Sequence, residues 1–184
     1  MNIPYWILST VYSLAKRFKN KKMTTPTHIF SDQSRIWVYQ SNREFTESEV
    51  GEMNAHLAKF AQKWVSHQHQ LIAHGEVLHQ RFVVLMVDDV QGNGASGCSI
   101  DASVKFVQEL GKAYRTDLFN RLEFAYFDEG KVKVIHKTEL PKLLEEGVIS
   151  EETLFFDNLV KDKGALKDRW MVPLKDSWHR RFAG

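Results

Sequence analysis

Hydrophobic and polar positions from residue 34 to residue 114 alternate between strand-like and helix-like patterns. The stretch SRIWVYQ, residues 34–40, is β-branched, aromatic and apolar on both faces, which predicts a strand. Over residues 46–67 apolar side chains recur at helical spacing, and Thr46 with Glu49 forms a capping-box pattern at the start. A helix is therefore expected soon after the first strand.

Two more strands and a second helix are expected next. Residues 71–79 and 81–89 predict strands joined by a tight turn. The uninterrupted apolar run Phe82–Val87 in the second of them predicts a central place in a sheet. Apolar side chains return at helical spacing over residues 99–114, which predicts the second helix.

The C-terminal third is less regular. Residues 122–136 alternate in polarity around Asp128–Gly130, which predicts a hairpin. A short helix is expected within residues 139–150, and the tail from residue 157 mixes a short helix with aromatic-rich irregular chain.

These elements together predict an α+β fold. Their order is the split β-α-β-β-α-β order of ferredoxin-like domains, with an extra C-terminal hairpin strand and helical additions. In that topology the first and third strands are central, which agrees with the two stretches that are apolar on both faces, 34–40 and 82–87. The alternative is another α+β sheet with helices on one face.

Length and composition favour one domain. A chain of 184 residues with 43% hydrophobic side chains can bury one core, and we expect that domain to span residues 23–184. The single cysteine, Cys98, excludes an intramolecular disulfide and fits a reducing compartment, so a cytoplasmic location is expected. Residues 1–22 carry five basic side chains and no acid, which leaves the rest at −3. Nucleic-acid binding is therefore not expected.

Residues 1–22 form an apolar and basic leader. Its apolar part, residues 3–15, precedes the basic part, the reverse of a secretory signal, and it is shorter than the roughly 20 residues that span a bilayer. It is an interfacial membrane anchor, a segment that docks on the domain, or sequence upstream of a start at Met23. We favour the last interpretation, and membrane contact is expected only if the leader is an anchor.

The stretch QGNGASGCSID, residues 91–101, joins a predicted central strand to a predicted helix. Glycines there permit positive φ, and free N–H groups at a helix N-terminus favour anions, so Gly94, Ser96, Gly97 and Ser99 are candidate ligands of a small anion. Neither a P-loop nor a dinucleotide fingerprint is present, because no lysine follows the last glycine and no parallel βαβ unit accompanies the loop. The alternative is a strand-to-helix connection capped by Ser99 and Asp101.

Cys98 is a second chemical candidate. A thiol at a helix N-terminus can act as a nucleophile, and the catalytic set for this hypothesis is Cys98, Asp101 and His74 as a base. No spacing forces a histidine toward Cys98, and phosphatase, C-x-x-C and zinc-deaminase patterns all fail. A small buried cysteine in packing is the alternative. The scattered histidines indicate surface imidazoles, so no metal and no cofactor is expected.

Two further groups of polar residues could take part in a site, one at the end of the central strand and one in the C-terminal tail. Asp88 and Asp89 end the predicted central strand, and a solvated strand end is expected, although either could meet the loop or Arg121. The tail interleaves basic and aromatic side chains, which makes a candidate surface for a protein partner. Its residues are Trp178, His179, Arg180 and Arg181. The favoured alternative is a tail that wraps the domain with its tryptophans buried.

Residues 28–183 resemble a family of small uncharacterised bacterial proteins. The resemblance rests on the stretches SRIWVYQ, GASGCSID, DLFNRL and VPLKDSWHRRF. Members are sometimes labelled "ABC transporter ATPase", but this sequence has no Walker A lysine loop and no LSGGQ-like signature. The resemblance implies no established activity, and it suggests that residues 1–22 lie outside the shared domain.

Two function classes follow from the sequence. The first is a cytoplasmic binding module that takes a small anionic ligand or a protein partner through the glycine-rich loop or the tail. The second is a thiol-dependent enzyme that uses Cys98. Whether the chain is an enzyme stays open at this point.

Overall fold

A computed structural model describes residues 30–90 and 94–184 of the chain. Its first sheet has three antiparallel strands in the order β1-β5-β4. These strands are β1 (Arg35–Gln40), β4 (Ala73–Leu78) and β5 (Phe82–Val87). The predicted central strand, β5, is fully buried and lies between the other two.

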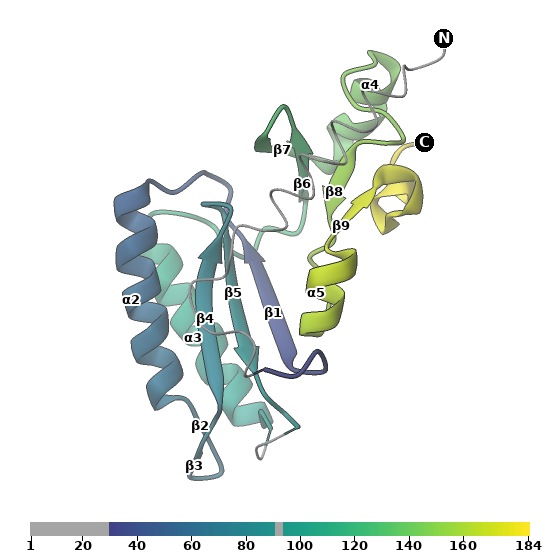
Figure 1. Cartoon of the computed structure of the whole chain (residues 1–184). Coiled ribbons are helices and arrows are strands. Elements are labelled where there is room, and N and C mark those ends of the chain that lie inside the picture. Colours follow the sequence, from purple (N-terminus) through teal and green to yellow (C-terminus); the bar gives the residue numbers. More distant parts are fainter. Residues whose placement is uncertain (1–29, 91–93) are drawn as a thin grey trace.

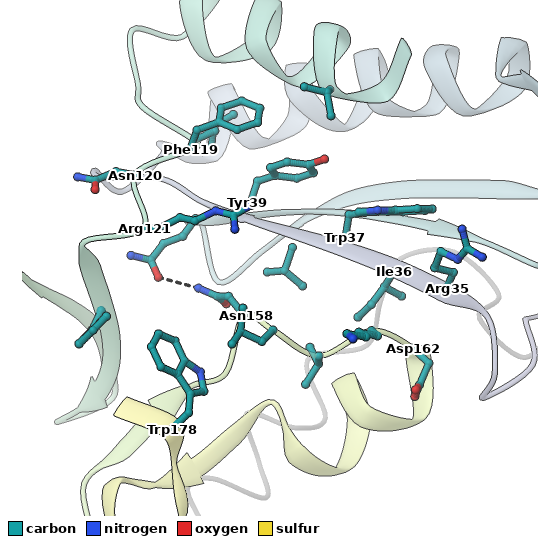
Figure 2. A pocket seen from close by; sticks show the side chains of 18 of the residues that line it. Arg35, Ile36, Trp37, Tyr39, Phe119, Asn120, Arg121, Asn158, Asp162 and Trp178 are labelled. Atoms are coloured by element: carbon teal, nitrogen blue, oxygen red, sulfur yellow. Dashed lines mark hydrogen bonds between the residues drawn. The ribbon is translucent and has the colours of Figure 1, made fainter. Parts of the chain in front are cut away.

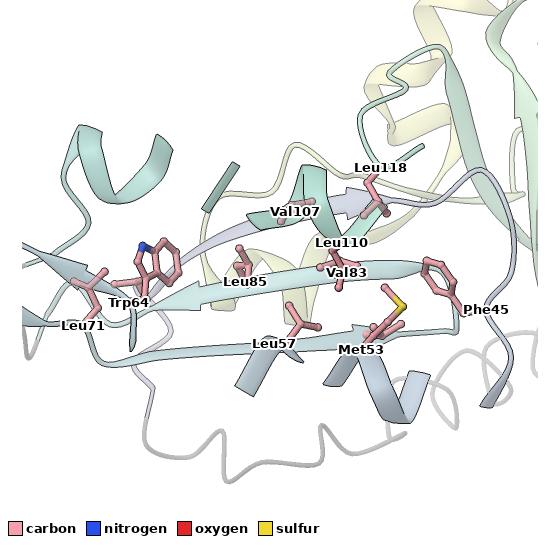
Figure 3. Close-up of a cluster of buried hydrophobic side chains, with 12 residues drawn as sticks. Phe45, Met53, Leu57, Trp64, Leu71, Val83, Leu85, Val107, Leu110 and Leu118 are labelled. Carbon is pink, nitrogen blue, oxygen red and sulfur yellow. The ribbon is translucent and has the colours of Figure 1, made fainter. Parts of the chain in front are cut away.

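Two helices of 17 residues each, α2 (Glu47–Lys63) and α3 (Gly97–Ala113), cover one face of this sheet (Figure 1). Their apolar sides meet alternate side chains of β5 in a buried cluster that includes Leu57, Leu85 and Val107 (Figure 3). The capping box predicted at the start of α2 is confirmed, because Thr46 and Glu49 bond reciprocally. The helix ends at Lys63, and Trp64 turns the chain into the small hairpin of β2 (Val65–Ser66) and β3 (His69–Gln70).

A second sheet of four antiparallel strands has the order β7-β6-β8-β9. The predicted hairpin supplies β6 (Glu123–Asp128) and β7 (Lys131–His136). Two short strands that the sequence pattern did not predict complete the sheet, β8 (Leu154–Phe156) and β9 (Met171–Pro173). Between the hairpin and β8 lie a 3-10 turn, η2 (Lys137–Glu139), and the short helix α4 (Leu140–Glu145).

The C-terminal segment packs onto both sheets. Helix α5 (Lys163–Arg169) belongs to a buried cluster that joins the second face of the first sheet to β8. Figure 1 shows α5 on the side of β1 that faces away from α2 and α3. Two 3-10 turns, η3 (Leu174–Asp176) and η4 (Trp178–Phe182), pack on the second sheet in a third cluster.

The fold is mixed α+β, as predicted, but the ferredoxin-like order is not confirmed. β5 is central, whereas β1 is an edge strand and β6 pairs with β7 and β8 in the other sheet. β1 is apolar on both faces because Trp37 and Tyr39 pack toward the helices, while Ile36 and Val38 pack in the α5 cluster. Burial of both faces does not require a second neighbouring strand.

Among the residues that the structure describes, no helix is long and apolar enough to cross a bilayer. The predicted leader, residues 1–22, lies outside the described residues.

Candidate functional site

A groove of about 840 Å³ runs along the edge of β1 that faces away from β5 (Figure 2). Three further segments border it, namely residues 118–124, residues 158–162 and the start of η4 at Trp178. These segments lie far apart in the sequence and meet where the two sheets approach each other.

The groove is closed at both ends. At one end the Ile36 N–H donates to the Lys161 carbonyl (3.0 Å), and the Lys163 N–H donates to the Ser34 carbonyl (2.9 Å). This is an antiparallel bridge between Arg35 and Asp162. At the other end the Gln40 side chain donates to the carbonyl of Glu123 (3.3 Å) and accepts from Asn158 (2.8 Å; Figure 2).

Between these ends the backbone of β1 faces the groove. Alternate residues of a strand direct their N–H and C=O groups to opposite sides. Since Ser34 and Ile36 bond away from β5, the backbone groups of Val38 point into the groove as well. Within residues 30–90 and 94–184, no backbone hydrogen bond is formed to Val38 from that side.

Aromatic and aliphatic side chains form the walls. Tyr39 packs edge-on against Phe119, with ring centroids 5.3 Å apart, and Figure 2 shows both on one side of β1. On the other side lies Trp178, and the lining also includes Leu159, a residue that is 54% exposed. Burial raises the pKa of Tyr39, against the opposing effects of a Ser103 hydrogen bond and the charge of Arg121. Tyr39 is therefore a neutral hydroxyl at physiological pH.

Charged side chains link the Arg35 end of the groove to the glycine-rich loop. Arg35 Nε lies 2.9 Å from an oxygen of Asp89, whose other oxygen accepts from the Ala95 N–H at 3.2 Å. Gly94 has φ +58°, and a Cβ there would come within 3.2 Å of the same carboxylate oxygen. Both features favour glycine at position 94, and the Ala95 N–H is occupied by a carboxylate of the protein itself. The sequence left open whether Asp88 and Asp89 form a solvated strand end or contact the loop or Arg121. Asp89 contacts the loop.

The other predicted anion ligands lie at the start of α3, which begins two residues earlier than predicted. Ser96 is the N-cap but makes no side-chain capping bond, and Gly97 is exposed. Ser99 is buried, donates from Oγ to the Ser96 carbonyl (2.8 Å), and accepts at its own carbonyl from Trp64 (2.8 Å). Ser99 is therefore a packing residue and not the cap that the pattern indicated. Residues 91–93 lie outside the described residues.

The predicted catalytic residues are not brought together. Cys98 and Asp101 are exposed on the first turns of α3, so the expectation of a buried cysteine is wrong. His74 pairs across β4 and β5 with Met86, which packs in the α5 cluster on the face of the sheet opposite α2 and α3. The sheet thus lies between His74 and Cys98, and the neighbour of the His74 Nε2 is Glu76 Oε1 at 3.4 Å.

Of the predicted partner surface in the tail, Trp178 and His179 are packed, whereas Arg180 and Arg181 are exposed. His179 is 2% exposed and stacks on Trp178 at 3.9 Å between ring centroids. Trp178 Nε1 donates to Asp157 (2.9 Å), Arg180 pairs with Glu151 (2.8 Å), and Arg181 lies over the Trp178 ring. The favoured alternative, a tail that wraps the domain, describes these contacts, and Trp178 also borders the groove.

Comparisons with family models, with curated proteins and with solved structures found no match for this chain. In the described part of the chain, no group of three or more histidine, cysteine or acidic side chains is placed to hold a metal ion.

Sequence reasoning missed most of the groove. Four lining residues were not among the predicted site residues, because each has the sequence context of an ordinary core or loop position. They are Tyr39, Phe119, Asn158 and Leu159.

Proposed function

We propose that this chain is a binding module whose site is the groove along β1. The observation that carries the proposal is an inward-facing strand edge at Val38 between two apolar walls. The volume of about 840 Å³ lies in the range of ligand pockets, which are mostly apolar with a few polar groups that fix orientation. The proposed binding site is therefore the groove, and not the glycine-rich loop beside it that the sequence suggested.

Two cations of the groove are available to a ligand. Arg121 and Lys161 line it, are exposed, and form no ion pair with any of the described residues. The lining also holds three acids, so its overall charge is balanced; of these, Asp89 pairs with Arg35, while Glu123 and Asp162 lie toward the two ends of β1. An amphipathic anion would find a cation and apolar contacts beside Arg121 or Lys161.

The probe for this proposal is 8-anilinonaphthalene-1-sulfonate, an amphipathic anion that fluoresces in apolar sites. We expect saturable binding to the full chain, weakened about tenfold by Leu159→Ser, which removes a wall of the groove. Val148→Ser is the matched control, because Val148 is exposed to the same extent, 54%, outside the groove. Equal binding by both variants would overturn the proposal, provided that circular dichroism shows both to be folded.

An anion site at the loop itself has less support than the groove, because Asp89 already occupies the Ala95 N–H. The thiol-enzyme alternative is supported by the exposure of Cys98 at the start of a long helix. Its test is alkylation by iodoacetamide at pH 6, where an activated thiolate should react at least about tenfold faster than free cysteine. Equal rates would remove this alternative.

Three finer expectations remain proposals. The ferredoxin-like order is supported by the sequence of elements β1-α2-β4-β5-α3-β6, interrupted by the small β2–β3 hairpin, and by the start of β6 beside the end of β1 through the Gln40–Glu123 bond. The resemblance of residues 28–183 supports membership of the small bacterial family described above. The single cysteine supports a cytoplasmic location.

A further inference from the structure

Both edges of the first sheet leave backbone groups without a backbone partner among the described residues. At the β4 edge the Asn54 side chain accepts from the outward-facing Val77 N–H (2.8 Å). At the β1 edge the Arg35 end is paired through the bridge to Asp162, and the rest of this edge borders the groove. Exposed strand edges are templates for pairing with another chain, and natural proteins usually cover them.

The uncovered part of β1 offers a row of backbone groups. By the alternation along the strand, these are the Ile36 carbonyl, both groups of Val38 and the Gln40 N–H. None of them has a backbone partner on the groove side within the described residues. In the predicted ferredoxin-like order this is where a fourth strand would lie, and the structure places that strand, β6, in the other sheet.

From these observations we infer that the groove takes an extended segment of another protein as an added antiparallel strand beside β1. The inference rests on the proposed function and names the ligand class of that same site. Residues 161–163 already pair antiparallel with this edge at Arg35, so the added strand continues an existing pattern. Main-chain hydrogen bonds supply affinity in this mode of recognition, and pockets for alternate side chains supply specificity.

The shape of the site selects a single extended chain over a second copy of this protein. The edge of β1 lies between the wall of Tyr39 and Phe119 and the wall that contains Trp178. The same edge in a second copy is equally recessed, so two such edges cannot approach to the roughly 4.8 Å that strand pairing requires. One peptide strand can enter, with alternate side chains directed to the two walls.

The two ends of the groove narrow the class of segment further. The Ile36–Lys161 bond at one end and the Gln40 side chain at the other leave open the edge from the Ile36 carbonyl to the Gln40 N–H. The segment that fits is therefore short and apolar at alternate positions.

The test begins with a phage-displayed library of random six-residue peptides selected on the full chain. We expect enrichment of sequences that are apolar at alternate positions. The best peptide is then synthesised with a fluorescein label in two forms, N-methylated at its odd or at its even amides. Because a strand directs alternate amides to one side, one pattern should weaken binding at least about tenfold and the other should leave it within about twofold.

The experiments distinguish failure of this inference from failure of the proposed function. Equal effects of the two methylation patterns, or no enriched peptide, would overturn the inference. Binding of the naphthalene sulfonate that still depends on Leu159 would then leave the proposed function standing. Val38→Pro, which removes one groove-facing N–H, should abolish peptide binding, and the methylated peptides keep the test valid if that variant fails to fold. Concentration-dependent dimers that the peptide does not dissociate would assign the edge to a second copy.

Discussion

His179 lies among aromatic rings although its neighbours in the sequence suggested a solvent-facing basic surface. Trp178 stacks on it, Phe124 meets it edge-on at 4.5 Å, and Phe155 lies at 5.2 Å. Burial lowers the pKa of His179 from 6.5 to about 4, and the nearby charge of Arg181 acts in the same direction. The ring is therefore a neutral packing element at physiological pH.

This burial predicts a loss of stability in mild acid. Because the pKa of His179 is lower in the folded chain than in the unfolded chain, the unfolded state binds more protons between pH 6.5 and 4. The stabilisation is complete above pH 6.5 and is lost as the pH falls toward 4. From pH 7 to pH 5 the free energy of unfolding, measured in urea, should fall by about 2 kcal/mol through this group.

The variant His179→Gln isolates that contribution. It removes the titrating ring, so its stability should fall less between pH 7 and pH 5 than that of the natural chain. If both proteins lost the same free energy over this interval, another group would be responsible.

At the scale of elements, β4 is tightly packed against buried side chains of α2 and β5 at Gly75. A Cβ at Gly75 would lie 2.9 Å from a methyl group of Leu85 and 3.1 Å from one of Leu57. Gly75→Ala should therefore force these buried side chains to shift and lower the free energy of unfolding by about 1–3 kcal/mol. The measurement is urea denaturation followed by far-UV circular dichroism.

Gly51 in α2 is the matched control for this prediction. A Cβ there would meet no atom within 4 Å, and the position is exposed in the helix interior. Gly51→Ala should stabilise the chain by about 0.5–1 kcal/mol, because alanine favours helix over glycine. The same sign of effect at both glycines would contradict the packing argument.

The elements that the sequence predicted well are those whose signal is local. The start of α2 was predictable because Thr46 and Glu49 satisfy the first N–H groups of their own helix. β5 was predictable as central because its burial on both faces is continuous. β8 and β9 have three residues each, which is too short for a pattern of alternating polarity to be recognised. They form strands because they pair with distant segments of the chain. The position of β1 at a sheet edge was not predictable, because apolar side chains on both faces of a strand do not tell whether one or two strands pair with it.

At the scale of the whole molecule, the candidate site is a product of how the two sheets meet. The groove needs β1 from one sheet, residues 118–124 that lead into the other, and the segment before α5. No local pattern reports that these segments converge. The sequence pattern pointed to the glycine-rich loop instead. Gly94 in that loop allows Asp89, which pairs with Arg35, to approach the loop backbone at the end of the groove.

The cluster that joins the sheets predicts that they unfold together. Phe156 of β8 is fully buried and lies 4.8 Å from Phe82 of β5 and 5.1 Å from Trp170, measured between ring centroids. Phe156→Leu removes ring contacts to both sheets and should lower the free energy of unfolding by about 1–2 kcal/mol. Because the contacts are shared, tryptophan fluorescence and far-UV circular dichroism should report one coincident transition in both proteins. Two separated transitions in the variant would show that each sheet folds with its own cluster, and that the groove between them forms only when the two dock.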